Sequence, residues 1–202
     1  MCPFIETLAV VAGRVRHLSY HEQRLNATRR YFWPEAKDIS LASVLSDAPS
    51  ADGLFKARLI YNEHGVITKT YLPYTMRQIS SLRLVCADDV DYSFKSTDRT
   101  YLNQLFAQRG TCDDILIIKN GLVTDTSFTN IALFDGYHWF TPDTPLLPGT
   151  MRAWLLDRGF VSTRRRNLRE ESRRRVFLPP SADRLRPQVG RQACTHRKIQ
   201  TS

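Results

Sequence analysis

Two dipeptides in the middle of the chain, Asn120-Gly121 and Asp135-Gly136, constrain its fold more than any other feature. Both are typical of two-residue turns between antiparallel strands, because Asn, Asp and Gly tolerate the positive φ angles of such turns. Apolar segments flank each dipeptide. The sequence therefore predicts two consecutive hairpins, formed by residues 115–119, 122–124, 130–134 and 137–140.

Strands and helices also alternate in the first third of the chain. Residues 4–11 form an apolar strand that ends in a turn at Gly13, and residues 55–61 and 66–72 form another hairpin. Between them we predict a helix that begins at Ser19 and ends before Pro34. Its expected apolar face consists of Leu25, Ala27, Thr28, Tyr31 and Phe32.

The remaining elements predict a mixed α/β (α+β) chain of two small domains. Residues 73–81 are interpreted as the linker between a first domain, residues 1–75, and a second, residues 80–162. The second domain contains a strand at residues 82–86 and a helix that starts at Thr97-Asp98. A last helix opens at Pro148-Gly149-Thr150 and stops near Gly159.

The net charge of +9 is unevenly distributed along the chain. Residues 163–202 hold twelve of the 29 basic and three of the 20 acidic residues, so residues 1–162 hold seventeen of each and are neutral. A neutral folded body argues against nucleic-acid binding. Residues 163–202 lack the apolar periodicity of a folded segment, and we expect a basic tail that is disordered, as though the reading frame had shifted near residue 163.

Four cysteines, far apart and without metal-ligand spacing, are expected to be free thiols in a reducing compartment. No apolar run approaches the length of a membrane span, and the first residues do not resemble a signal peptide. We therefore expect a cytoplasmic protein with no metal ion and no membrane contact.

An ordered series of motifs carries the functional information. The segment Tyr92-Ser-Phe-Lys95-Ser-Thr-Asp-Arg99 is followed by a pair of aspartates, an apolar strand and Asn-Gly at residues 113–121. Asp125 and Asn130 follow with four residues between them, and then come Thr-Pro at 141–142 and Gly-x-x-Arg at 149–152. In order and spacing, residues 3–160 resemble the fold-type IV enzymes that depend on pyridoxal 5′-phosphate (PLP). The openings Phe-Ile-Glu-Thr at 4–7 and His-Glu-Gln-Arg-Leu at 21–25 are similar too.

That family comprises class IV aminotransferases and 4-amino-4-deoxychorismate lyases. The resemblance implies two domains like those of D-amino-acid aminotransferase, PLP in the cleft between them, and a homodimer. It implies small-molecule substrates, with amino-group transfer between an amino acid and a 2-oxo acid as the first expectation. A β-elimination that releases pyruvate and 4-aminobenzoate is the alternative, and a catalytically degenerate PLP-binding protein is a second. The shared motifs do not separate these activities.

Lys95 is the expected catalytic lysine. PLP chemistry needs an amine that bonds to the cofactor's aldehyde and later carries a proton. Lys95 is one of six lysines, and it follows the aromatic residues Tyr92 and Phe94, which would lower its pKa by partial desolvation. A lysine outside such a motif would be interpreted as a solvated surface charge.

Asp125 matches the position of the acid that faces the pyridine nitrogen of PLP and keeps it protonated. Most of the family has Glu there, so the carboxylate of this chain is one methylene shorter. The alternative is an aspartate that only ends a strand or forms a turn.

The cofactor phosphate is expected at the start of the last helix, where Gly149, Thr150 and Met151 offer backbone N–H groups. By resemblance, Arg24 supplies the cation, although a surface arginine on an amphipathic helix would look the same. Many relatives carry Thr one place later, where this chain has Met151. This departure from the family pattern bears on a phosphate contact of the Thr150 hydroxyl and leaves the backbone contacts unchanged.

Arg58 corresponds approximately to a position that binds the substrate carboxylate in some relatives. It shares a strand face with Lys56 because the two alternate along the strand. A charged pair that protects a strand edge explains the same pattern.

Overall fold

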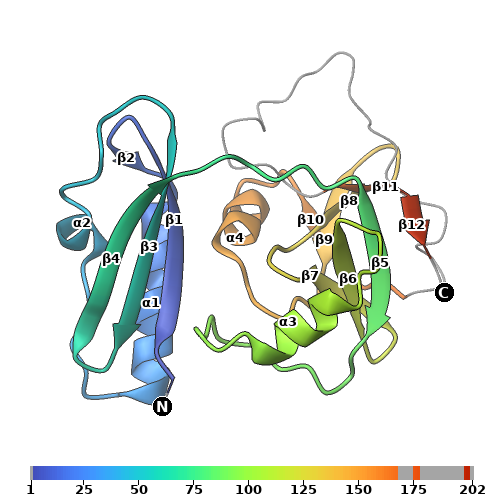
Figure 1. The fold of residues 1–202 in the computed structure, drawn as a ribbon, viewed down its shortest axis with the longest axis horizontal. Helices are drawn as coiled ribbons and strands as arrows, with labels where there is room; N and C mark the ends of the chain where they lie inside the picture. Colours follow the sequence, from blue (N-terminus) through green and yellow to red (C-terminus); the bar gives the residue numbers. More distant parts are fainter. Residues whose placement is uncertain (1, 168–174, 178–197, 201–202) are drawn as a thin grey trace. The chain divides into compact units, whose positions relative to one another are not determined.

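The computed structural model describes residues 2–167, 175–177 and 198–200. The chain divides into two compact units: unit 1 comprises residues 1–76 and 94–98, and unit 2 comprises residues 77–93 and 99–202 (Figure 1). Both units combine strands with helices, so the predicted mixed α/β class is confirmed. Residues 94–98, which include Lys95, belong to unit 1 although both flanking segments belong to unit 2.

Unit 1 is an antiparallel sheet with one long helix, α1 (Leu18–Phe32), against it. The strand order is β2–β1–β3–β4, and every neighbouring pair is antiparallel. Side chains of β1 alternate between buried and half-buried, because only one face of the sheet packs on the helix. The strands are β1 (Phe4–Val11), β2 (Arg14–Val15), β3 (Leu54–Asn62) and β4 (Gly65–Pro73).

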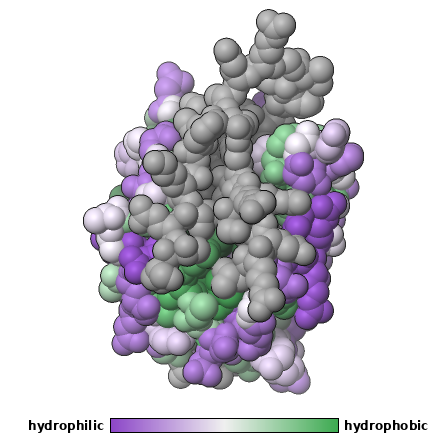
Figure 2. Space-filling model, turned by 90° about the vertical axis from the view of Figure 1, so that its right-hand side faces the viewer, coloured by the Kyte–Doolittle hydropathy of each residue, from purple (hydrophilic) through white to green (hydrophobic). Residues whose placement is uncertain are grey.

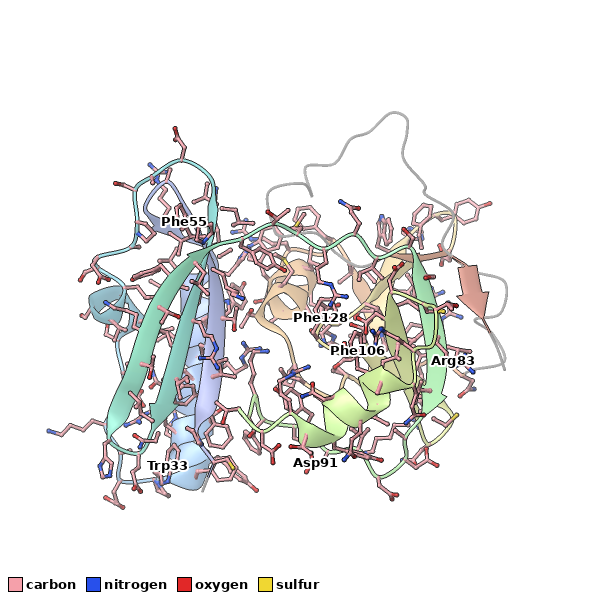
Figure 3. All side chains as sticks on the ribbon, viewed as in Figure 1. Trp33, Phe55, Arg83, Asp91, Phe106 and Phe128 are labelled. Carbon is pink, nitrogen blue, oxygen red and sulfur yellow. The ribbon has the colours of Figure 1, made fainter. Side chains whose placement is uncertain are left out.

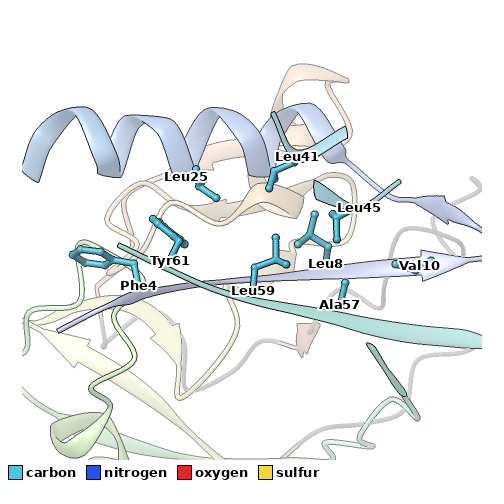
Figure 4. Packing of buried hydrophobic residues seen from close by; sticks show 9 residues of the cluster. All are labelled: Phe4, Leu8, Val10, Leu25, Leu41, Leu45, Ala57, Leu59 and Tyr61. Atoms are coloured by element: carbon cyan, nitrogen blue, oxygen red, sulfur yellow. The ribbon is translucent and has the colours of Figure 1, made fainter. Parts of the chain in front are cut away.

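The core of unit 1 lies between this sheet, α1 and the short helix α2 (Leu41–Val44) (Figure 4). The predicted apolar face of α1 is wrong at two positions, because Ala27 and Tyr31 are exposed. At 100° per residue, both lie far around the helix from Leu25, which is fully buried. Thr28 is buried as predicted, and three further polar residues share the buried face: His21, Asn26 and Arg29.

The described residues of unit 2 form two four-stranded sheets, ordered β12–β5–β6–β7 and β10–β9–β8–β11. The pairs β6–β7 and β8–β9 are antiparallel, which confirms the two predicted hairpins. At the first turn Asn120 and Gly121 have φ angles of 51° and 74°, as this turn chemistry requires. The strands are β5 (Ser81–Cys86), β6 (Asp114–Lys119), β7 (Leu122–Thr126), β8 (Ala132–Phe134), β9 (Trp139–Pro142), β10 (Ser162–Arg164), β11 (Arg175–Phe177) and β12 (Lys198–Gln200).

Both faces of strand β6 are buried, which places this strand in the core of unit 2. Ile115 and Ile117 pack in a cluster with α3 (Thr100–Ala107), whereas Leu116 and Ile118 pack in a second cluster with β8 and β9. On the molecular face in Figure 2, hydrophilic side chains border a group of hydrophobic ones. The last helix among the described residues is α4 (Thr150–Asp157). No described helix is long and apolar enough to cross a bilayer.

The tail expected from residue 163 onward begins with folded residues. Strand β10 runs parallel to β9, and the backbone N–H of Val123 donates to the carbonyl of Arg166 at 3.0 Å. Arg166 is buried, with its guanidinium 4.2 Å from the Phe140 ring centre. The boundary placed at 162 is therefore too early, since apolar patterning cannot detect an arginine that packs on an aromatic ring. Most of the predicted disordered tail, residues 168–174, 178–197 and 201–202, lies outside the described residues.

Candidate active site

Lys95 is held by its backbone on the first strand of unit 1. The N–H of Ile5 donates to the Lys95 carbonyl at 2.9 Å, and Ser96 forms a bridge with Phe4. The backbone N–H and the hydroxyl of Thr97 both donate to the carbonyl of Pro3, at 3.0 and 2.9 Å. The half-buried side chain of Lys95 therefore starts from a backbone that is fixed on both sides.

The aromatic neighbours of Lys95 pack in separate clusters. Phe94 lies 4.7 Å from Phe32 and 4.8 Å from Tyr31, measured between ring centres, within unit 1. Tyr92 packs on the α3 side of unit 2, where the guanidinium of Arg99 lies 5.5 Å from its ring centre. Phe94 thus anchors the lysine segment to α1, a role that its position in the sequence did not indicate.

Arg24 meets a fully buried acid, Glu6, which lies on the helix side of β1. The guanidinium grips the carboxylate with two hydrogen bonds, Nε to Oε1 at 2.8 Å and Nη2 to Oε2 at 2.7 Å. Nδ1 of His21 lies 2.6 Å from the same Oε2. This bidentate geometry aligns the arginine side chain and limits its rotation.

The charges in this cluster follow from its burial. Burial by itself would raise the pKa of Glu6, but the charge and hydrogen bonds of Arg24, with help from His21, lower that pKa to about 2. Burial lowers the pKa of His21 and outweighs the attraction of Glu6, and the positive charges of Arg24 and Lys95 act in the same direction. At neutral pH the cluster therefore contains a Glu6 anion, an Arg24 cation and a neutral His21.

We expect Glu6→Gln to destabilise the protein by about 3 kcal/mol at pH 7, because a drop in pKa from 4.5 to about 2 corresponds to that free energy. The depressed folded pKa means that the contribution is present above pH 4.5 and is lost as the pH falls toward 2. Urea unfolding of both proteins between pH 7 and pH 3 measures it, and the difference should shrink at low pH.

The matched control is Asp38→Asn, which breaks the ion pair between Arg30 and Asp38. Both side chains of this pair are more than half exposed, so its loss should cost less than about 1 kcal/mol. Equal effects of the two substitutions would contradict the role given to Glu6.

Asp125 is buried on β7 and accepts three hydrogen bonds from described residues. Its Oδ1 accepts from Nδ2 of Asn130 at 2.7 Å, and its Oδ2 accepts from the backbone N–H groups of Leu146 and Leu147 at 2.9 and 3.1 Å. Burial raises its pKa to about 6 despite these hydrogen bonds and the charge of Arg152. A carboxylate has roughly four acceptor positions, so one remains on Oδ1 for a further donor.

Helix α4 begins at Thr150, four residues after Leu146. Gly149 is its N-cap residue and makes no side-chain cap, and the first helical hydrogen bond runs from the N–H of Ala153 to the Gly149 carbonyl at 2.9 Å. The N–H groups of the first turn thus point out of the helix end, where its dipole favours an anion. The Met151 side chain packs with Leu155, so this residue contributes to such a site through its backbone.

The structure brings some of the predicted site residues together. In unit 2, Asp125 accepts hydrogen bonds from the loop that leads into α4, where Gly149 is the N-cap and Thr150 and Met151 are the first helical residues. In unit 1, the positive charges of Arg24 and Lys95 both lower the pKa of His21. Arg58 is apart from these two, because it pairs with Thr7 and so lies on the opposite sheet face from Glu6, the partner of Arg24.

Sequence reasoning gave no role to Glu6, His21 or Asn130. A signal for Glu6 was present in the sequence. Glu6 shares the two-residue period of Phe4, Leu8 and Val10, and this pattern predicts an acid on the buried face of the strand. Asn130 was assigned to a strand, but β8 starts at Ala132 and the amide of Asn130 serves the loop instead. No local pattern indicates that loop.

Two cations hold the loop of residues 127–129, which lies between Asp125 and Asn130 in the sequence. Arg99 donates to the carbonyl of Ser127 at 2.6 Å. The guanidinium of Arg77 lies 5.3 Å from the ring centre of Phe128 and 5.9 Å from that of Phe106 on α3 (Figure 3). Fixing this loop on α3 restrains both side chains at its ends.

Comparison with known proteins gives a consistent result. The family model described as amino-transferase class IV matches residues 4–171. An uncharacterised protein of Haemophilus influenzae is 38% identical over 167 residues, which cover 81% of this chain and 88% of that protein.

Solved structures agree. A protein of Haemophilus somnus, provisionally assigned as a 4-amino-4-deoxychorismate lyase, has a TM-score of 0.83 and 32% identity, covering 89% of this chain and 95% of that one. A protein of Mesorhizobium loti, provisionally assigned as an amino-acid aminotransferase, has a TM-score of 0.76 and 24% identity, covering 90% and 95% of the two chains. The second similarity concerns the fold alone.

Proposed function

Since this chain belongs to the amino-transferase class IV family, we propose that it is an enzyme that binds PLP and acts on the amino group of a small-molecule substrate. The observation that supports this most is in unit 2. A buried carboxylate with an acceptor position left on Oδ1 contacts the same loop that begins α4. A protonated ring nitrogen needs the first feature and a phosphate needs the second.

The residues fit the cofactor as follows. Lys95 would bond to its aldehyde, Asp125 would face the ring nitrogen, and the N–H groups of Gly149, Thr150 and Met151 would bind the phosphate together with Arg24. When bound, PLP serves as an electron sink for the bond that breaks at the amino-bearing carbon. Glu6 keeps the Arg24 guanidinium in one orientation, and the same cluster remains electrically balanced before the phosphate arrives.

The first proposed reaction is amino-group transfer between an amino acid and a 2-oxo acid. Arg58 is the proposed carboxylate-binding residue, since it is half-buried on the helix-free face of its sheet. The similarity to the Haemophilus somnus protein favours a second candidate, elimination from an aminodeoxychorismate-like substrate. Both reactions would use the same lysine, acid and phosphate site. We also propose that the active form is a homodimer.

A product assay with purified protein and PLP separates the two reactions. Transfer yields a new amino acid from a 2-oxo acid acceptor, while elimination yields pyruvate and 4-aminobenzoate with no acceptor present. Arg58→Ala should raise the KM for carboxylate-bearing substrates roughly tenfold or more. A protein that binds PLP but forms neither product would be a degenerate member, and one that binds no PLP would refute the proposal.

A further inference from the structure

Asn130 connects the buried acid to the loop that begins α4. Its Nδ2 group donates to Oδ1 of Asp125 at 2.7 Å and to the carbonyl of Leu147 at 2.9 Å, so one amide group uses both of its hydrogens. The other carboxylate oxygen, Oδ2, accepts from the N–H groups of Leu146 and Leu147. Side chain, acid and loop therefore form a closed ring of hydrogen bonds.

The opposite end of the amide touches Gly149. A Cβ atom added to Gly149 would lie 1.9 Å from Oδ1 of Asn130 and 3.1 Å from its Cγ. The backbone angles of Gly149, φ −73° and ψ 146°, are ordinary for any residue. Glycine is therefore needed here for space beside Asn130, and its conformational freedom is not the reason.

We propose that Asn130 is a positioning residue that holds Asp125 and the amino end of α4 in one fixed geometry. This rests on the proposed function, because the acid and the helix start are the two parts of unit 2 assigned to the cofactor. Because one amide fixes both the Asp125 carboxylate and the start of α4, the contacts to the PLP ring and to its phosphate would depend on each other. Among the described side chains, Asn130 is the one that donates a hydrogen bond to Asp125.

A neutral side chain, not a charged one, orients the carboxylate of Asp125. Arg152 acts on Asp125 through its charge, but its hydrogen bonds go to the Thr141 hydroxyl at 3.3 Å and the Pro142 carbonyl at 2.9 Å. An amide orients the carboxylate without neutralising it, which leaves the negative charge for a cationic ligand.

The packing part of the proposal is tested by a double-mutant cycle of Gly149→Ala and Asn130→Ala, read as melting temperature in the absence of cofactor. We expect Gly149→Ala alone to lower the Tm by roughly 5–10 °C, because the methyl group collides with the amide. In the Asn130→Ala background the same change should cost less than half as much. Equal costs in both backgrounds would overturn the contact.

The functional part is tested by binding of PLP and of pyridoxal, which lacks the phosphate. Asn130→Ala should weaken both by roughly tenfold or more and shift the pH midpoint of the bound chromophore, because acid and helix start lose their alignment. Asn103→Ala, an exposed position on α3, is the matched control and should change neither.

The outcomes are distinct. If the wild-type protein binds no PLP, the proposed function fails, while the melting cycle still decides the Asn130 contact. If Asn130→Ala binds both ligands with wild-type affinity and an unchanged pH midpoint, the positioning role is refuted although the proposed function stands. Asn130→Asp sharpens the test, since a second carboxylate 2.7 Å from Asp125 should displace the midpoint further than alanine does.

Discussion

Lys95→Ala is expected to lower turnover by at least roughly a thousandfold, the largest effect of any single substitution in this chain. The substitution removes the Lys95 amine, which would form the covalent bond to PLP and would also carry the proton. Stability should change little, because the Lys95 segment is fixed to unit 1 by a backbone hydrogen bond from Ile5 and by the Phe94 ring, both of which remain. Product formation, together with borohydride trapping and peptide mapping of the labelled residue, measures the effect.

Lys37→Ala is the control for a lysine with an exposed side chain, and it should retain wild-type turnover and labelling. In the wild type the borohydride label should be found on Lys95. A label on Lys56, Lys69 or Lys119 would contradict the assignment, as would a Lys95→Ala protein that still traps the cofactor.

Asp125→Asn should reduce turnover by roughly a hundredfold or more, since the loss of a charge contact worth about 3 kcal/mol in the transition state has that effect. The amide keeps the size of the side chain and removes its charge. Covalent trapping at Lys95 should persist, which distinguishes a lost acid from a lost cofactor. Asp125→Glu should be tolerated, because most of the family has Glu there. A wild-type rate in Asp125→Asn would show that the residue serves only the fold.

Asp125 also predicts a pH dependence of stability. Its folded pKa, about 6, lies above the ordinary 3.8, so the folded protein binds this proton more tightly than the unfolded chain does. The resulting stabilisation is complete below pH 4 and is lost as the pH rises through 6, a change of about 3 kcal/mol. Denaturant unfolding of Asp125→Asn, which lacks this proton, should show the advantage of the wild type shrinking over that interval.

Local chemistry was enough to predict the strands and their turns. Asn120-Gly121 and Asp135-Gly136 each lie between two paired strands. They were recognisable because turn chemistry and two-residue alternation depend on only a few neighbouring residues. The start of α4 at Gly149 was recognisable for the same reason. The apolar face of α1 was only partly recognised, since polar side chains such as Asn26 are buried there by bonds to a distant loop, at Ile39.

The sequence by itself determined the mixed α/β class and the predicted hairpins, because periodicity and turn chemistry are properties of neighbours along the chain. The residues proposed for PLP were identified by motifs whose order and spacing resemble those of the family. Only the tertiary structure decided how those residues are supported. Glu6 accepts hydrogen bonds from Arg24, which is 18 residues away in the sequence, and Asp125 accepts from N–H groups 21 and 22 residues away. Such pairings require the whole unit to fold first, since a buried polar atom takes its partner from whatever packing brings within about 3 Å.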